Sequence, residues 1–194
     1  MAETPSTMLP LGTPLPSLRL IDATTDREID AAEAARGKAG LVVAFICNHC
    51  PFVKHIRKEL VRAAHDAIDR NLVFLAVNSN DEKAYPEDGP GAMRELATEE
   101  AWRFPYLFDE TQSVAKNFHA ACTPDFYLFD GQLRLVYRGQ FDDSRPSSGR
   151  PVTGSSLRAA VDAVVAGRAP SAEQKPSVGC NIKWKPGNAP AYFG

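Results

Sequence analysis

Two cysteines separated by two residues, Cys47 and Cys50, lie at the junction between an apolar run and an amphipathic segment. The run 41–46 (LVVAFI) is apolar throughout, which is typical of a strand buried on both faces of a sheet. From 52 to 68 the apolar residues recur at helical spacing, and a second apolar run follows at 72–77. This order predicts a right-handed βαβ unit with the cysteine pair at the start of its helix.

The rest of the chain adds strands and helices to this unit. Short helices are expected at 92–100 and 112–119, and an Asp-Gly pair between the runs 126–129 and 133–137 is a strong hairpin signal. A closing helix is expected to be capped by one of the serines at 155–156. These elements predict an α/β fold with a central mixed sheet flanked by helices on both faces.

The length of 194 residues fits a single domain, 1–194. Residues 1–16 carry four prolines and predict an extended lead-in, and a short strand at 18–22 extends the sheet at its N-terminal side. The segment 170–194 has four prolines and no periodicity, so we expect an irregular tail. Because this tail contains a cysteine and several aromatic residues, it should dock on the body.

The composition excludes several classes of protein. A hydrophobic fraction of 44% and a charged fraction of 24% are ordinary for a globular protein. A net charge of -2 supplies no positive field for nucleic acid or an anionic membrane. No apolar run approaches the roughly 18 residues of a membrane span, and the first residues lack the basic start and apolar core of a signal peptide. We therefore expect a cytoplasmic protein with reduced thiols and with no nucleic-acid or membrane partner.

The spacing of Cys47 and Cys50 suits redox chemistry. The reactive species is the thiolate, a free cysteine has a pKa of about 8.5, and the N-terminus of a helix stabilises an anion. One sulfur can attack a substrate and the other can resolve the mixed disulfide. We expect Cys47 to attack, because the earlier sulfur in such turns is normally the exposed one. If Pro51 is the first helical residue, Cys50 is the cap and the dipole favours either sulfur.

His49 lies between the two cysteines. As a cation or an N–H donor it would stabilise the thiolate, and a stabilised reduced form makes the disulfide more oxidising. We therefore expect a reduction potential above about -270 mV. The alternative interpretation is a polar side chain that only faces solvent.

The two remaining cysteines, Cys122 and Cys180, allow several interpretations. Four thiolates could hold zinc, but zinc half-sites usually come as two close pairs, and these two cysteines lie far apart in the sequence. Either one could act as a relay that resolves the disulfide or passes it on. The simpler alternative is a small buried hydrophobic residue, which is the common fate of a free cysteine.

The sequence Cys122-Thr123-Pro124 leads into an apolar strand. Proline at the entrance of a strand needs no functional reason. A cis bond before Pro124 is, from the sequence alone, a minority outcome of about 5%. Such a bond would leave the backbone of Thr123 free to pair with an extended substrate segment, so Thr123 and Pro124 are the candidate substrate-binding residues.

Three segments carry a resemblance to a known family: CNHCPFV at 47–53, CTPDFYLFD at 122–130 and GCNIKWK at 179–185. In their βαβ context they resemble the thioredoxin superfamily, and most closely its peroxiredoxin-like AhpC/TSA (redoxin) group. The resemblance covers residues 11–185. It implies a thioredoxin-like fold, a cis Pro124 facing the first cysteine, and thiol-dependent redox activity.

Some positions depart from the family pattern. Thioredoxins carry Trp before the first cysteine and a buried Asp six residues before it, where this chain has Ile46 and Leu41. Peroxiredoxins place a peroxide-binding Thr three residues before the peroxidatic cysteine. Aligning Cys50 with that cysteine puts Cys47 at the Thr position. The resemblance therefore implies thiol chemistry more strongly than fast peroxide reduction.

From these features we predict a thiol–disulfide oxidoreductase of cell redox homeostasis. Cys47 attacks, Cys50 resolves and His49 tunes the thiolate, with no cofactor, no resident metal, and a reductant such as thioredoxin or glutathione. The first alternative is a thiol-dependent peroxidase that uses the same cysteines. The second is a metal-binding protein on the same scaffold, with Cys47, Cys50 and either His119 or Cys122 as ligands.

Overall fold

The computed structural model describes residues 3–193. The strands are β1 (Glu3–Pro5), β2 (Arg19–Asp22), β3 (Glu28–Asp30), β4 (Gly40–Phe45), β5 (Leu72–Asn78), β6 (Tyr106–Phe108), β7 (Cys122–Thr123), β8 (Asp125–Asp130), β9 (Leu135–Gly139) and β10 (Val178–Asn181). The helices are α1 (Ala31–Ala34), α2 (Pro51–Asp69), the 3-10 turn η1 (Pro86–Asp88), α3 (Pro90–Glu99), α4 (Ser113–Asn117) and α5 (Ser155–Val165).

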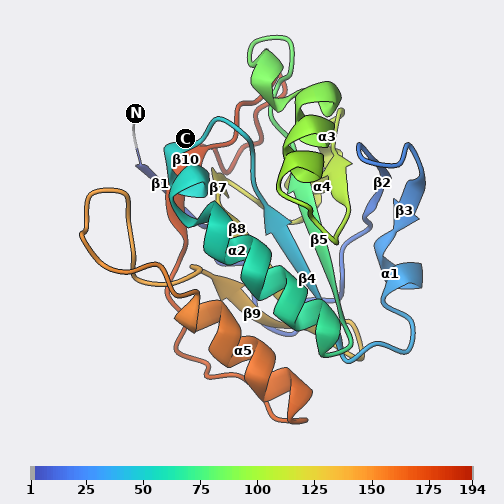
Figure 1. The fold of residues 1–194 in the computed structure, drawn as a ribbon, viewed down its shortest axis with the longest axis vertical. Helices are drawn as coiled ribbons and strands as arrows, with labels where there is room; N and C mark the ends of the chain where they lie inside the picture. Colours follow the sequence, from blue (N-terminus) through green and yellow to red (C-terminus); the bar gives the residue numbers. More distant parts are fainter. Residues whose placement is uncertain (1–2, 194) are drawn as a thin grey trace.

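Seven strands form one mixed sheet in the order β3-β2-β6-β5-β4-β8-β9 (Figure 1). The pairs β4–β5 and β5–β6 are parallel, joined by crossovers through α2 and α3, and β4–β8 and β8–β9 are antiparallel. The predicted βαβ unit and hairpin are therefore confirmed, with β4 near the middle of the sheet.

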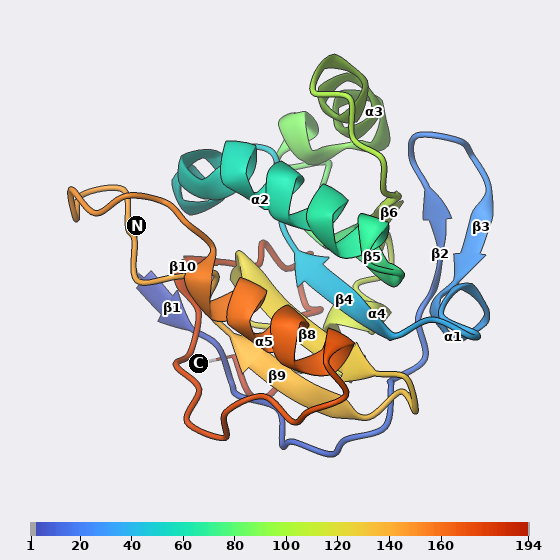
Figure 2. The same cartoon turned by 60° about the horizontal axis from the view of Figure 1, so that its bottom comes forward.

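Side chains of β4 alternate between two buried faces, which explains its uniform apolarity. Val42 and Ala44 face a core shared with α2, α3 and α5. Leu41, Val43 and Phe45 face a second core, which includes residues of α1 and α4. Figure 2 shows α2 and α5 lying across the sheet. Each large apolar side chain buried in this way stabilises the fold by about 1.5–3 kcal/mol.

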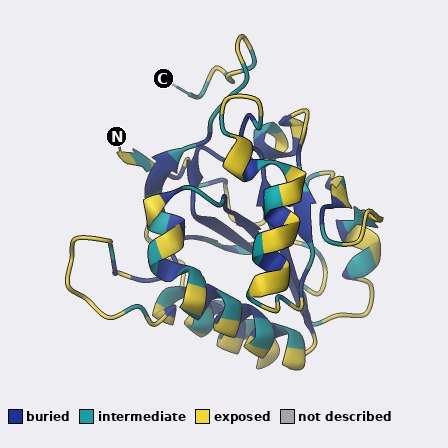
Figure 3. Cartoon of the chain, turned by 45° about the horizontal axis from the view of Figure 1, so that its top comes forward, coloured by how far each residue is buried: buried dark blue, intermediate teal, exposed yellow. Residues whose placement is uncertain are grey.

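The C-terminal tail docks on the body, as predicted, and adds a second sheet. Strand β10 lies between β1 and β7 in an antiparallel three-stranded sheet. Cys180 and Ile182 of this tail are buried, and Figure 3 shows the buried strands beneath helices whose outer faces are exposed. The tail thereby places one of the four cysteines inside the protein.

Three features differ from the sequence expectations or add to them. Strand β2 lies where a short strand was predicted, but its antiparallel partner β3 and the short helix α1 were not predicted. Helix α5 begins at Ser155, but its cap is Gly154 in the left-handed region (φ 65) and no serine side chain caps it. The Phe141 carbonyl accepts hydrogen bonds from the first-turn N–H groups of Ser156 (3.1 Å) and Leu157 (3.2 Å), which replaces a serine cap, and the Asp142 carboxylate accepts from the N–H groups of Thr153 and Gly154 just before the helix (2.7 Å each). No helix within 3–193 is both long and apolar enough to cross a membrane.

Candidate active site

The cysteine pair lies where β4 ends and α2 begins. Cys50 is the N-cap residue of α2 in an extended conformation (φ -61, ψ 123), and Pro51 is at the start of the helix. Proline suits this position because it has no N–H group to leave unpaired. Both sulfurs thus lie at the positive end of a 19-residue helix dipole, as the sequence predicts.

Both thiols are buried in this conformation. The relative exposure of Cys47 is 1% and that of Cys50 is 0%, so the expectation of an exposed Cys47 is wrong. The imidazole of His49 stacks on the ring of Tyr85, with centroids 4.9 Å apart and planes 9° apart. The Lys183 Nζ lies 5.9 Å from the centroid of the Tyr85 ring. The loop that carries Tyr85 and the tail that carries Lys183 therefore meet at His49.

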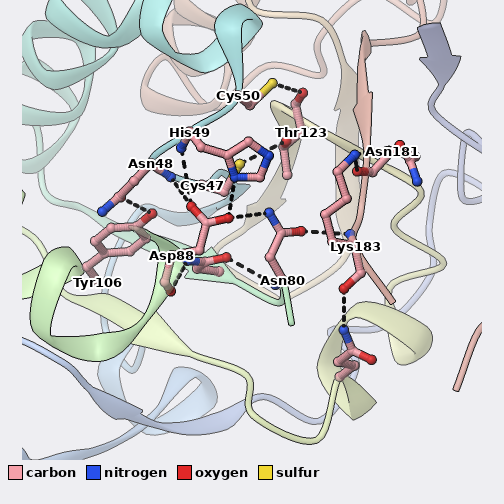
Figure 4. Close-up of polar contacts among 12 residues, drawn as sticks. Cys47, Asn48, His49, Cys50, Asn80, Asp88, Tyr106, Thr123, Asn181 and Lys183 are labelled. Atoms are coloured by element: carbon pink, nitrogen blue, oxygen red, sulfur yellow. Dashed lines mark hydrogen bonds and ion pairs between the residues drawn. The ribbon is translucent and has the colours of Figure 1, made fainter. Parts of the chain in front are cut away.

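Thr123 contacts both sulfurs from the opposite side (Figure 4). The peptide bond between Thr123 and Pro124 is cis, as the family resemblance implies. The Cys50 thiol donates to the Thr123 carbonyl oxygen (Sγ to O 3.2 Å), and the Cys47 Sγ lies 3.5 Å from the Thr123 hydroxyl Oγ1. The loop before β8 and the start of α2 are thereby joined at the dithiol.

The two cysteines differ in acidity. A hydrogen bond from the Cys47 thiol is the largest influence on Cys50, and with contacts from Cys180 and Thr123 it lowers the pKa of Cys50 to about 5, against the opposing effect of burial. Burial, with a smaller effect of Asp88, raises the pKa of Cys47 well above its ordinary value. As a thiolate, Cys50 gives up its bond to the Thr123 carbonyl and accepts from these donors instead. The favoured thiolate is therefore Cys50.

His49 is held by an ion pair that sequence reasoning missed. The distance from His49 Nδ1 to Asp88 Oδ2 is 2.5 Å. This hydrogen bond is the main cause that raises the pKa of His49, against the effect of burial. Burial opposes ionisation of Asp88, but hydrogen bonds from His49 and Asn80 outweigh it and lower its pKa. The pair therefore favours a protonated imidazole beside a charged carboxylate.

Asp88 also fixes the backbone between the cysteines. Its Oδ1 accepts from the N–H groups of Asn48 (2.8 Å) and His49 (3.2 Å), and its Oδ2 accepts from Asn80 Nδ2 (2.7 Å). Tyr106 donates to the side chain of Asn48 (3.0 Å). The unusual length of the loop after β5 was the only sequence signal for a functional role, and it does not single out Asp88.

One group of side chains in the described part of the chain meets the distance requirement of a metal site. The ligand atoms of Cys47, His49 and Asp88 lie within 4.8 Å of one another. The predicted alternative ligands do not join it: His119 stacks on Tyr192, with ring centroids 5.0 Å apart, and Cys122 is not in the group. A metal ion would also have to replace the ion pair between His49 and Asp88.

The backbone edge expected to bind substrate is already paired. Strand β10 lies antiparallel to β7, with Cys180 opposite Thr123 and Asn181 opposite Cys122. Gly179 approaches Thr123 so closely that a Cβ there would lie 2.0 Å from the Thr123 carbonyl oxygen. The chain's own tail thus occupies the edge next to Pro124, which corrects the predicted mode of docking.

The two additional cysteines are both buried, at different places. Cys122 contacts the Pro124 carbonyl (Sγ to O 3.9 Å), and burial raises its pKa well above the ordinary value. The thiol of Cys180 interacts with that of Cys50, and burial together with this contact raises the pKa of Cys180 to about 12. The structure therefore brings Cys180 to the dithiol, and the relay roles stay predictions.

Comparisons with known proteins give a consistent result. The model of the AhpC/TSA family matches residues 11–138. An uncharacterized conserved protein from Geobacillus kaustophilus has 53% identity and a TM-score of 0.93, with 96% of this chain and 98% of that chain covered. A hypothetical protein from Sinorhizobium meliloti has 47% identity and a TM-score of 0.91, with 95% and 100% covered.

A peroxidoxin from Mycobacterium tuberculosis is only 12% identical, and its TM-score of 0.59 over 82% of this chain and 98% of that chain supports the fold alone. No curated protein matches the chain. The fold is thioredoxin-like, and at the level of the family the chemistry is that of thiol–disulfide oxidoreductases or peroxidases. The chain belongs to the AhpC/TSA family.

Proposed function

We propose that the protein is a thiol–disulfide oxidoreductase of the cytoplasm whose redox couple is Cys47 and Cys50. The observation that carries this proposal is the position of Cys50 as the N-cap residue of α2, next to the Cys47 thiol, whose hydrogen bond lowers the pKa of Cys50 to about 5. Thiolate stabilisation by a helix N-terminus and an adjacent donor is what a reactive cysteine requires. Exchange between thiols and disulfides needs no cofactor.

In this mechanism Cys50 is the attacking sulfur, which reverses the order expected from the sequence. Its thiolate attacks a client disulfide, forms a mixed disulfide and releases the first client thiolate. Cys47 then loses its proton and attacks the Cys50 sulfur, which releases the second client thiol and leaves the Cys47–Cys50 disulfide. The imidazolium of His49, held by Asp88, faces the Cys47 side of this reaction.

The burial of both sulfurs makes local opening a step of the reaction. The loop that carries Tyr85 and the tail that carries Lys183 meet over His49. A client or a reductant such as glutathione or thioredoxin reaches the sulfurs when the loop that carries Tyr85 moves away from His49 and the fixed tail. Such openings lie at the low-stability end of a protein's motions.

A titration in glutathione redox buffers tests the proposal. The wild-type chain should show a single two-electron transition, and peptide mapping of the oxidised form should find Cys47 joined to Cys50. Cys50→Ser should abolish the transition. The matched variant Cys122→Ser removes another buried thiol, and comparison with the wild-type transition shows whether Cys122 contributes to it. If the thiols of the wild-type chain stay reduced across the whole glutathione range, the proposal is wrong.

A second candidate function is peroxide reduction by the same thiolate. The Cys50-Pro51 pair at the start of α2 provides an acidic thiol, and the Thr123 hydroxyl near Cys47 supplies a hydrogen-bond donor that the peroxiredoxin alignment lacked. Consumption of hydrogen peroxide with dithiothreitol as reductant measures this activity. Turnover that is lost in Thr123→Val, while disulfide exchange persists, would favour the peroxidase.

A further inference from the structure

The docked tail places a third thiol next to the favoured thiolate. Cys180 of β10 is the register partner of Thr123, and residues opposite each other in an antiparallel pair have Cα atoms about 4.5–5.5 Å apart. The Cys50 Sγ lies 3.2 Å from the carbonyl oxygen of the same Thr123. Cys50 and Cys180 also belong to one buried cluster between α2 and the sheets. Cys50 therefore lies between two thiols, Cys47 and Cys180.

This third thiol is held in place on several sides. The Ile182 N–H donates to the Ala121 carbonyl (3.0 Å), and the Asp81 N–H donates to the Lys183 carbonyl (2.9 Å). The Gln112 side chain donates to the same Lys183 carbonyl (2.9 Å). On its other edge β10 pairs with β1. These hydrogen bonds hold strand β10 in position on both sides, so Cys180 stays beside Cys50.

From this placement we propose that Cys180 is a resolving cysteine: it forms a disulfide with Cys50 after Cys50 has been captured in a mixed disulfide. The inference rests on the proposed function, because it needs Cys50 to react first. Cys180 attacks the Cys50 Sγ, the bond between the two sulfurs forms, and the bond from Cys50 to the client sulfur breaks. The client leaves as a thiolate and takes up a proton to replace the one that Cys180 lost. Over both steps, two electrons pass from Cys50 and Cys180 to the client disulfide.

The acidity of Cys180 changes in the direction that this step needs. While Cys50 is a thiolate, burial, the contact with Cys50 and the charge of Cys50 all raise the pKa of Cys180, and the charge of Lys183 lowers it. Once Cys50 is part of a disulfide its charge is gone, so two of these three unfavourable influences disappear. Cys180 is then easier to deprotonate when there is a disulfide for it to attack.

Cys50 and Cys180 are far apart in the sequence, unlike the two cysteines of the CxxC motif. Cys47 approaches Cys50 along the turn before α2, whereas Cys180 approaches it from a strand at the far end of the chain. Cys50 can therefore pair with a partner on either side, and loss of one partner should leave the other. Removal of Cys47 isolates the second pairing.

The test uses oxidised glutathione as the probe and the full chain carrying Cys47→Ser. Three proteins are compared at equilibrium by intact mass and peptide mapping after acid quenching: Cys47→Ser alone, Cys47→Ser with Cys180→Ala, and Cys47→Ser with Cys122→Ala. The first and third should contain a Cys50–Cys180 disulfide and no bound glutathione. The second should retain one glutathione on Cys50. Circular dichroism of each protein establishes that it is folded.

Two results of the same experiment would contradict the inference. Glutathione retained on Cys50 in Cys47→Ser alone would overturn the inference, and so would a disulfide that depends on Cys122 and not on Cys180. These failures differ from failure of the proposed function, in which Cys50 would react with glutathione in no variant and the wild-type chain would form no disulfide. A second variant, Cys180→Ser, should give the same result as Cys180→Ala, because neither side chain can form a disulfide.

Discussion

The acidity of Cys50 should depend on the thiol of Cys47. That thiol is the largest influence lowering the pKa of Cys50, and a hydrogen bond to a charged group contributes about 1.5–3 kcal/mol. Because one pKa unit corresponds to about 1.4 kcal/mol, Cys47→Ala should raise the pKa of Cys50 by about 1–2 units. The expected change is from about 5 in the wild-type chain to between about 6 and 7.

The ultraviolet absorbance of the thiolate, followed against pH, measures this change without requiring access to the buried sulfur. Cys180→Ala should give a rise in the same direction, because the Cys180 contact also lowers the pKa of Cys50. Cys122→Ala is the matched control and should leave the lowest thiol pKa unchanged. A wild-type transition near pH 8.5, or a transition that Cys47→Ala does not move, would refute the reasoning.

The same acidity sets an expected reduction potential. The reactive thiol of thioredoxin has a pKa of about 7 and its potential is about -270 mV. A pKa of about 5 favours the thiolate at pH 7 by about 2 kcal/mol more, which is about 50 mV for two electrons. The potential of the Cys47–Cys50 couple should therefore be near -220 mV, within roughly 30 mV. A value at or below that of thioredoxin would contradict it.

Three further predictions concern the surroundings of the dithiol. Asp88→Asn should lower the pKa of His49, because the hydrogen bond to Asp88 is the main cause of its rise; the imidazole proton resonances report it. Burial raises the pKa of Asp125 to about 7, so ionisation of this carboxyl lowers the stability of the wild-type chain between its ordinary pKa of about 4 and pH 7, and the free energy of unfolding of Asp125→Asn should gain about 2–3 kcal/mol on that of the wild-type chain between pH 5 and pH 8; an unchanged difference would show that the carboxyl does not titrate there. Gly179→Ala should lower the stability by about 1–3 kcal/mol because its Cβ would meet a backbone carbonyl at 2.0 Å, whereas Gly91→Ala, which meets nothing within 4 Å, should not; thermal unfolding of both variants makes the comparison.

The sequence predicted those parts of the fold that depend on local pattern. The apolar run of β4, the helical spacing of α2 and the Asp-Gly hairpin before β9 each appear where they were expected. Strands of two to four residues, such as β7 and β10, are too short for periodicity to reveal, and they exist here because they pair with each other. The order of strands in the second sheet is therefore a tertiary property.

The residues of the candidate site also fall into two groups, those that the local sequence predicts and those that only the tertiary structure brings together. Cys47, His49 and Cys50 follow from a local motif, and the cis bond before Pro124 follows from the family resemblance. Asp88 was missed because it reaches His49 from a loop about 40 residues away, among several other acidic side chains. The exposure of Cys47 was predicted wrongly because its burial depends on residues from distant parts of the chain, such as Thr123, whose hydroxyl lies 3.5 Å from the Cys47 sulfur.

The charged groups near the three thiols act differently on Cys47 and Cys180, the two possible disulfide partners of Cys50. While Cys50 is charged, it raises the pKa of both Cys47 and Cys180. When Cys50 becomes part of a disulfide, the charge of Asp88 continues to raise the pKa of Cys47, whereas the charge of Lys183 continues to lower that of Cys180. Cys47 must therefore lose its proton against the charge of Asp88, whereas the charge of Lys183 favours the ionisation of Cys180 once Cys50 has reacted. Both Cys47 and Cys180 can form a disulfide with Cys50, and the charges around them favour Cys180 as the first of the two to ionise.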